Sequence, residues 1–267
     1  MKIMPMVLCF FLPAHVILAQ EHLEKRPFYY VAHRGASYLA PENTLASIKL
    51  AWELGADAAE CDVMLTADQQ VVLFHDSNTK RLTGQNFEVG ESSWEALKSL
   101  VVIPRATNYP EYVNETIPLL SDVLGTIPAG RMLVIEIKTG PEILPVLKEV
   151  LEQHWTSGRI SFIAFDFETI CGAKVLFPEV PAYYLSSFRA DVNRRFEDVV
   201  TQGIDGLDLR HAIINEAMAD RCRDAGLDLW CWTVNDPGTA LKMKALGVSA
   251  VTTDRPSWLK EQVLSQK

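Results

Sequence analysis

Short runs of β-branched and aromatic residues alternate with amphipathic segments from about residue 28 to the end of the chain. Such alternation is typical of repeated strand and helix units that build a parallel sheet. The apolar runs predict eight strands, at residues 29–33, 58–63, 132–137, 160–165, 182–185, 206–209, 229–233 and 250–253. Helical patterns fall between them, at residues 44–55, 143–154, 168–176, 193–202, 215–225 and 239–246.

Eight strands within roughly 250 residues argue for an α/β protein of the (β/α)8 type, the TIM barrel. A doubly wound open sheet is the alternative, but no G-x-G-x-x-G or Walker-type glycine loop follows any of the strands. The first helix has the expected ends, with Asn43 or Thr44 as its N-cap and Gly55 as its C-cap. We therefore expect one barrel domain.

A ninth apolar run, at residues 71–75, follows the second strand after only a few polar residues. Because a parallel crossover needs about a dozen residues or more, these two runs must form an antiparallel hairpin. A turn centred on Asp68 and Gln69 would set Asp62 opposite His75.

The segment at residues 77–118 is rich in Thr, Asn, Gly, Tyr and Pro, and it has one helical patch at residues 92–100. It is too long for a plain loop. We expect it to form a small insertion over the mouth of the barrel, directly after the hairpin.

The first 19 residues have the pattern of a cleaved secretory signal, with one early lysine, an apolar run and a small residue before a polar change. As a membrane span the segment is poor, because Pro5, Pro13 and His15 interrupt a stretch that barely reaches the roughly 20 residues required. An uncleaved anchor is the alternative. We therefore expect a signal at 1–19 and an exported domain at 20–267, periplasmic or extracellular, without stable membrane insertion.

The overall composition is that of an ordinary globular protein, 48% hydrophobic and 22% charged. Its 34 acidic and 25 basic residues give a net charge of -9, and no Lys/Arg block is interleaved with aromatic residues. This disfavours nucleic acid and anionic lipid as partners. The cysteines after the signal lack CxxC spacing, so they predict no metal site. Buried free thiols are expected, although Cys222 and Cys231 are close enough in sequence for a disulfide.

Acidic side chains recur at two strand ends. Glu60 and Asp62 are two residues apart, so both leave the same face of their strand. Two carboxylates converging inside a barrel repel each other unless a cation lies between them, and a hard divalent ion accepts such oxygen ligands. Glu136 and Lys138 repeat this spacing on a later strand. The simpler interpretation is an isolated ion pair between the two residues. Alternatively, Glu136 is a third ligand and Lys138 contacts an anionic substrate.

Two histidines, His33 and His75, are predicted to flank the acids. A single histidine at a strand end is more often structural than catalytic. A pair beside three acids and two basic residues suits phosphoester cleavage, which needs one proton acceptor and one donor with pKa values near neutrality. Arg34 can hold a phosphate through two hydrogen bonds, and Gly35 lets the backbone approach closely.

Two aromatic residues, Phe165 and Trp232, stand at strand ends further along. Each can be ordinary barrel packing, or a wall for the alkyl or glycerol part of a substrate at the C-terminal rim. We keep both as candidate pocket residues.

Seven short motifs in this order resemble the glycerophosphodiester phosphodiesterase family. They are HRG at 33–35, PENT at 41–44, ExD at 60–62, HD at 75–76, ExK at 136–138, WTVN at 232–235 and TDRP at 253–256. Each is weak alone, but together they span almost the whole expected domain. One departure is Ala164 before Phe165, where the family often has serine, and this affects a minor pocket contact.

The resemblance implies a (β/α)8 barrel with a small insertion, one divalent cation, Ca²⁺ or Mg²⁺, and hydrolysis of glycerophosphodiesters to sn-glycerol 3-phosphate and an alcohol. Carried over by position, the catalytic pair is His33 and His75. The metal ligands are Glu60, Asp62 and Glu136, and the phosphate contacts are Arg34 and Lys138. We expect His33 to accept a proton and His75 to donate one, with the reverse order left open.

Two rival functions stay open. The first is a related barrel that acts on intact lipids, a lysophospholipase D or a phospholipase C-like enzyme, which would need an apolar or basic rim to dock on a bilayer. The second is a secreted binding barrel without catalysis, which would be marked by loss of a histidine or an acid. The sequence leaves the head group, the first nucleophile and the oligomeric state undetermined.

Overall fold

The computed structural model describes residues 27–103 and 112–266. Eight parallel strands close into a barrel, because β1 pairs with both β2 and β9. The strands are β1 (Tyr29–Ala32), β2 (Ala58–Leu65), β4 (Met132–Ile137), β5 (Arg159–Ala164), β6 (Ala182–Ser186), β7 (Gly206–Arg210), β8 (Asp228–Trp232) and β9 (Ala250–Thr253). The predicted (β/α)8 barrel is confirmed, and each strand end lies within about two residues of its expected position.

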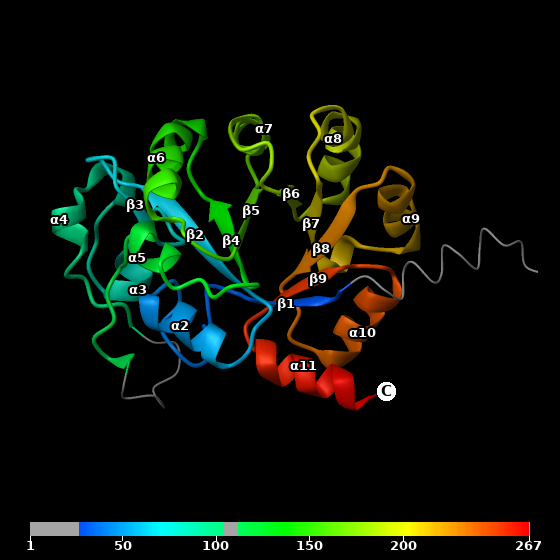
Figure 1. Cartoon of the computed structure of the whole chain (residues 1–267), viewed down its shortest axis with the longest axis horizontal. Helices are drawn as coiled ribbons and strands as arrows, with labels where there is room; N and C mark the ends of the chain where they lie inside the picture. Colours follow the sequence, from blue (N-terminus) through cyan, green and yellow to red (C-terminus); the bar gives the residue numbers. More distant parts are fainter. Residues whose placement is uncertain (1–26, 104–111, 267) are drawn as a thin grey trace, which may run out of the picture.

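Helices surround this barrel on all sides (Figure 1). They are α2 (Leu45–Glu53), α5 (Leu120–Leu124), α6 (Leu144–His154), α7 (Phe167–Leu176), α8 (Arg189–Thr201), α9 (Glu216–Asp224), α10 (Pro237–Ala245) and α11 (Pro256–Ser265), with 3-10 turns η3 (Pro141–Ile143) and η4 (His211–Ile213). The N-cap of α2 is Thr44, which forms a reciprocal capping box with Ser47. Gly55 follows this helix with φ +77°, a left-handed conformation that favours glycine. The sequence analysis did not predict α5 and α11.

The hairpin after β2 is present, but its predicted register is wrong by one residue. In β3 (Val71–Leu73), Leu73 pairs with Val63, and the Phe74 amide donates to the Asp62 carbonyl at 3.0 Å, so Phe74 rather than His75 lies opposite Asp62. The cause is a connection of three residues instead of two, with Gln69 in the left-handed region at φ +60°.

The expected insertion follows this hairpin and has its own small core. It contains α3 (Lys80–Thr83), η1 (Val89–Glu91) and α4 (Trp94–Leu97), so only part of the expected helical patch at 92–100 is helical. Its buried side chains Leu82, Val89, Leu97 and Ile117 pack on Met64, Val72 and Phe74 of the hairpin. In Figure 1 these elements lie together beside β3 at one end of the molecule. The insertion is therefore anchored on the strand pair that leads to His75.

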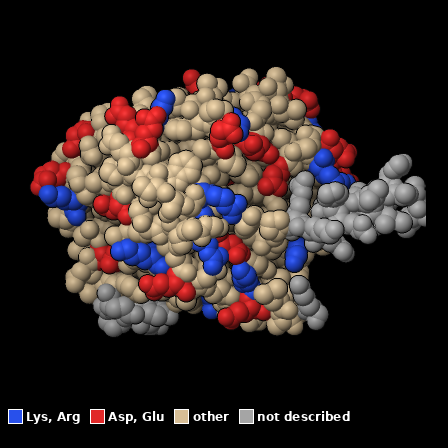
Figure 2. Space-filling view, viewed as in Figure 1, with Lys and Arg blue, Asp and Glu red and all other residues tan. Residues whose placement is uncertain are grey.

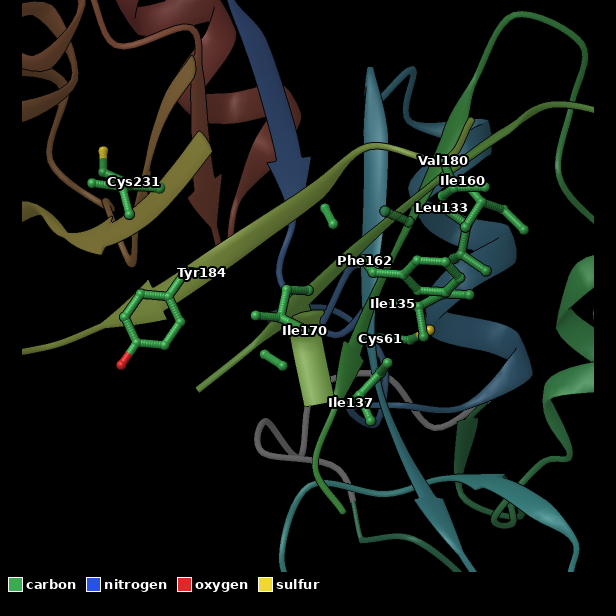
Figure 3. Packing of buried hydrophobic residues seen from close by; sticks show 14 of the residues in the cluster. Cys61, Leu133, Ile135, Ile137, Ile160, Phe162, Ile170, Val180, Tyr184 and Cys231 are labelled. Carbon is green, nitrogen blue, oxygen red and sulfur yellow. The ribbon is translucent and has the colours of Figure 1, made fainter. Parts of the chain in front are cut away.

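Side chains alternate between two cores along every barrel strand. On β4, Leu133, Ile135 and Ile137 point outward and pack with Phe162 against the helices (Figure 3). Met132 and Val134 point inward and pack in the barrel interior with Tyr183 and Trp230, whose rings stack at 4.0 Å. These large rings fill the barrel below its C-terminal end, which leaves that end for the cavity.

Acidic and basic side chains are interspersed on the face shown in Figure 2, without one broad basic area there. Among the helices of the described residues, none is long and apolar enough to span a membrane. The signal expected at 1–19 lies outside the described residues. The cysteines of the described chain, Cys61, Cys171, Cys222 and Cys231, are free thiols.

Candidate active site

Three carboxylates meet at the C-terminal end of two adjacent strands. Glu60 and Asp62 lie on β2, Glu136 lies on β4, and the strand register pairs Asp62 directly with Glu136. One oxygen of each lies within 4.8 Å of the others. Glu60 Oε1 and Asp62 Oδ1 are buried and have no hydrogen-bond partner in the part of the chain that the structure describes. The three residues expected to hold a metal are thus brought together.

Without a cation, these carboxylates repel one another and their charged forms are disfavoured. Burial, and then the charges of Asp62 and Glu136, raises the pKa of Glu60 well above its usual range. Burial, and then the charge of Asp62, raises the pKa of Glu136 to about 7. The oxygens lack hydrogen-bond donors and the acids resist ionisation, and a hard divalent cation would relieve both. The donor set therefore fits calcium or magnesium.

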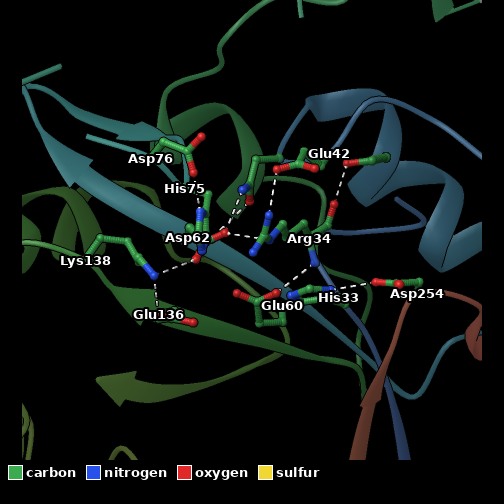
Figure 4. A network of polar contacts seen from close by, with 12 residues as sticks. His33, Arg34, Glu42, Glu60, Asp62, His75, Asp76, Glu136, Lys138 and Asp254 are labelled. Atoms are coloured by element: carbon green, nitrogen blue, oxygen red, sulfur yellow. Dashed lines mark hydrogen bonds and ion pairs between the residues drawn. The ribbon is translucent and has the colours of Figure 1, made fainter. Parts of the chain in front are cut away.

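Two basic side chains lie against the same acids (Figure 4). Lys138 Nζ is 2.7 Å from Glu136 Oε1 and 3.6 Å from Asp62 Oδ1. Arg34 Nε is 3.2 Å from Asp62 Oδ2. Burial alone would lower the pKa of Lys138, but the charges of Glu136 and Asp62 outweigh it and raise that pKa. Both side chains therefore stay cationic at the site, as an anion-binding role requires.

A tight turn after β1 positions the carboxylates of β2. The Arg34 amide donates to Glu60 Oε2 at 2.7 Å. Asn43 makes two bonds with Asp62: its side-chain amide donates to Oδ2 at 2.8 Å, and its Oδ1 accepts from the Asp62 backbone amide at 3.0 Å. Arg34, Gly35 and Asn43 all have positive φ values, and a Cβ on Gly35 would lie 2.5 Å from the Ser47 backbone carbon. Glycine is therefore required here.

Each histidine has a carboxylate at its Nδ1 atom. For His33 it is Asp254 at 2.7 Å, which in turn accepts from the Asn235 side-chain amide at 2.8 Å. For His75 it is Asp76 at 2.6 Å. This pairing leaves Nε2 of both rings for proton transfer. Burial, with a contribution from the positive charge of Arg34, lowers the pKa of His75.

The two histidines and the basic residues share one cavity of about 210 Å³. Phe165 and Trp232 form part of its wall, with their rings edge to face at 5.6 Å. Asp62 does not line the cavity but lies directly behind it, 1% exposed. The structure thus gathers the nine residues predicted from sequence, which are His33, Arg34, Glu60, Asp62, His75, Glu136, Lys138, Phe165 and Trp232.

A further chain of polar contacts, which the sequence analysis did not anticipate, links His75 to Arg34. Asp76 pairs with the Arg81 guanidinium, Arg81 reaches Glu42 Oε1 at 2.8 Å, and the same oxygen accepts from Arg34 at 2.7 Å. Asp76 and Glu42 stand inside the quoted motifs HD and PENT, so a signal for them existed. Arg81 lies in α3 of the insertion and stands in none of the motifs.

Removing the Arg81 bridge should lower activity without unfolding the protein. Arg81→Met leaves Asp76 and Glu42 without their shared cation, so we expect kcat to fall about 10-fold through misplacement of His75 and Arg34. Asp76 would then act on His75 uncompensated, which raises the pKa of His75 and moves a limb of the pH–rate profile upward. Lys80→Met, an exposed neighbour in α3, is the matched control. An unmoved profile in Arg81→Met would contradict this role.

The raised pKa values also predict how stability depends on pH. A carboxyl whose folded pKa exceeds its unfolded value stabilises the fold at low pH and loses that contribution as pH rises through the folded value. For Glu136 the window is between about 4.5 and about 7. Cation-free protein should therefore melt several degrees lower at about pH 7.5 than at about pH 5, and Glu136→Gln should reduce this difference.

Added calcium should raise the melting temperature more at the higher pH, because the ligands are then ionised. Melting curves with chelator and with excess cation at both pH values measure this. Equal cation-induced shifts at the two pH values would contradict the proposed ligand set.

Comparisons with known proteins agree with this geometry. A family model described as the glycerophosphoryl diester phosphodiesterase family matches residues 33–257. The chain is 31% identical over 239 residues to YhdW of Bacillus subtilis strain 168, covering 86% of this chain and 96% of that protein. It is 29% identical over 235 residues to a glycerophosphodiester phosphodiesterase of Caldanaerobacter subterraneus, covering 86% and 95%. A solved Oleispira antarctica phosphodiesterase in complex with sn-glycerol 3-phosphate has a TM-score of 0.81 at 30% identity, over 90% of this chain and 98% of that one.

Proposed function

The chain belongs to the glycerophosphoryl diester phosphodiesterase family, and on that premise we propose that it hydrolyses glycerophosphodiesters to sn-glycerol 3-phosphate and an alcohol. The observation that carries the proposal is one cavity lined by two cationic side chains, two carboxylate-paired histidines and two of three converging carboxylates, with the third, Asp62, directly behind it. Such a set can bind a phosphodiester, stabilise its developing charge and move two protons.

Glu60, Asp62 and Glu136 would hold one divalent cation, for which we propose calcium or magnesium because all three donors are hard oxygens. When bound, the cation supplies positive charge that polarises a phosphoryl oxygen. Asn43 and the Arg34 backbone amide keep the two carboxylates of β2 fixed. The protein is therefore preorganised for its cofactor.

Arg34 and Lys138 neutralise the phosphate and the charge that gathers on its oxygens. Arg34 is held by Asp62 and Lys138 by Glu136, so little reorganisation is needed during reaction. We propose that the edge-to-face pair of Phe165 and Trp232 flanks the carbon portion of the substrate.

His33 and His75 carry out the proton transfers. Asp254 and Asp76 fix the ring orientations and stabilise the charged forms. Burial lowers the pKa of His75 and so favours its neutral form, and a neutral ring can accept a proton. This favours the reverse of the order expected from sequence, in which His33 accepts a proton and His75 donates one. The expected order stays a prediction, and the leaving-group experiment in the Discussion tests it.

We further propose that the enzyme is exported, to the periplasm or beyond the cell, because the first 19 residues have the features of a cleaved signal. Its acidic net charge favours small soluble diesters over nucleic acid or anionic membranes. N-terminal sequencing of secreted protein that begins at Met1 would contradict signal cleavage.

The activity is tested with purified protein, glycerophosphocholine and calcium or magnesium, by enzymatic detection of glycerol 3-phosphate. Release of that product from the soluble diester is the expected result. Preference for lysophospholipid micelles would favour a lysophospholipase D, and release of diacylglycerol from bilayers would favour a phospholipase C. Binding without turnover under every cation would identify a barrel that only binds.

A further inference from the structure

Asp208 is a buried acid that none of the proposed steps uses. It lies on β7, is 1% exposed, and lines the same cavity as the histidines. Its Oδ1 has no hydrogen-bond partner among the described residues. Burying such an oxygen without a partner is costly, so its persistence on a cavity wall calls for a ligand that supplies the missing bond.

The surroundings of Asp208 differ from those of the three metal-site acids. The strand register places Leu185 of β6 and Trp230 of β8 on either side of it. In the described parts of the chain no lysine or arginine forms an ion pair with Asp208, and it is not one of the three clustered ligands. The described residues therefore offer Asp208 no cationic partner, which leaves its Oδ1 available to a hydroxyl or amide of a ligand.

The position of Asp208 in the cavity indicates which part of the substrate it meets. The charged wall comes from β1, β2 and β4, with Arg34, Glu60 and Lys138, and this wall takes the phosphate. Across from it the wall comes from β5 to β9, with Ile163, Leu185, Trp232 and Asp208. A group attached to the phosphate extends over this second, largely apolar wall, where Asp208 is the acidic group.

We propose that the Asp208 carboxyl binds a hydroxyl of the substrate's glycerol group and thereby selects glycerol over other alcohols at this position. The inference rests on the proposed function. A deeply buried acid suits a small polyol, whereas a bulky head group leaves toward solvent at the open end. Isolated polar groups in apolar pockets discriminate strongly, because an analogue without the matching hydroxyl leaves them unpaired.

The test compares kcat/KM for glycerophosphocholine with its 1,2-propanediol and 1,3-propanediol analogues, each of which lacks one hydroxyl. Wild-type enzyme should prefer glycerol over one of the analogues roughly 10- to 100-fold. Asp208→Leu, which removes the acid at similar size, should lose that preference by slowing glycerol turnover and leaving the analogue within about threefold of wild type. Asp208→Asn, which keeps hydrogen-bonding capacity, should be intermediate.

Ser161→Ala is the matched control, because Ser161 is another buried side chain that finds no hydrogen-bond partner within residues 27–103 and 112–266, but it does not line the cavity. It should keep the wild-type preference. Equal losses on all three substrates in Asp208→Leu would overturn the inference, as would an unchanged preference for glycerol over the analogues, with or without a changed cation requirement. If Asp208→Leu fails to fold, the preference for glycerol can be measured instead as a ratio of inhibition constants. Glycerol 3-phosphate and the propanediol phosphates are compared as inhibitors of wild type and of Asp208→Asn.

A wild-type enzyme without activity on glycerophosphocholine would instead overturn the proposed function. The two failures are therefore distinguishable.

Discussion

His33→Ala and His75→Ala are each expected to lower kcat on glycerophosphocholine by roughly 100- to 10,000-fold, the range for loss of a positioned acid or base. Each ring has a carboxylate fixed at Nδ1 and faces the cavity with its other nitrogen available. Because neither ring belongs to either hydrophobic core of the barrel, the fold should survive both substitutions.

A change of leaving group separates the roles of the two histidines. With p-nitrophenol as the alcohol, the leaving oxygen departs without needing a proton, so the variant that lacks the donor should recover most of its activity. We expect this recovery for His75→Ala and not for His33→Ala. Recovery in His33→Ala alone would reverse the assignment.

The exposed His154 at the end of α6 offers the matched control, and His154→Ala should turn over at the wild-type rate. Near wild-type turnover in both cavity variants, with calcium or magnesium present, would refute acid–base catalysis by this pair.

The second large effect concerns the cation site. Chelation should abolish activity, and calcium or magnesium should restore it. Glu60→Gln should lower kcat/KM about 100-fold or more, even at saturating cation, because one charged ligand is lost from the cluster of three. Assays with stepwise re-addition of each cation after chelation measure both effects and identify the preferred ion.

The same substitution should stabilise the cation-free protein. Glu60 is buried, and its charged form is disfavoured by burial and by Asp62 and Glu136, so a neutral amide of equal size removes that penalty. Loss of activity together with a higher melting temperature would show that the defect lies in the site and not in folding. Exposed Glu179→Gln should change neither quantity. Full activity of Glu60→Gln after chelation would refute the metal site.

The site thus exchanges stability for function. Three acids converge where the fold alone would favour apolar side chains, and the turn that holds Glu60 and Asp62 places Arg34 and Asn43 at positive φ values. Such strain persists only where the surrounding hydrogen bonds determine the conformation, as the paired contacts between Asn43 and Asp62 do here.

The pattern along the chain determined the barrel and most of its active site. Period-two alternation places Glu60 and Asp62 on one face, and parallel strands bring their ends to one rim, so the cluster with Glu136 follows from sequence. The same alternation in GLDLR would have placed Asp208 inside the barrel, had it been applied there. The choice of Thr44 over Asn43 as N-cap was left open, because both residue types suit the position.

Only the tertiary structure decided the contacts that depend on loop geometry. The hairpin register depends on the left-handed conformation of Gln69. The sequence does not indicate this conformation, because the residue is not glycine. Likewise, Arg81 bridges Asp76 and Glu42 only because the insertion packs on the hairpin through its own core. Local periodicity fixes which face a side chain leaves, whereas the partner it meets depends on the path of chain between distant segments.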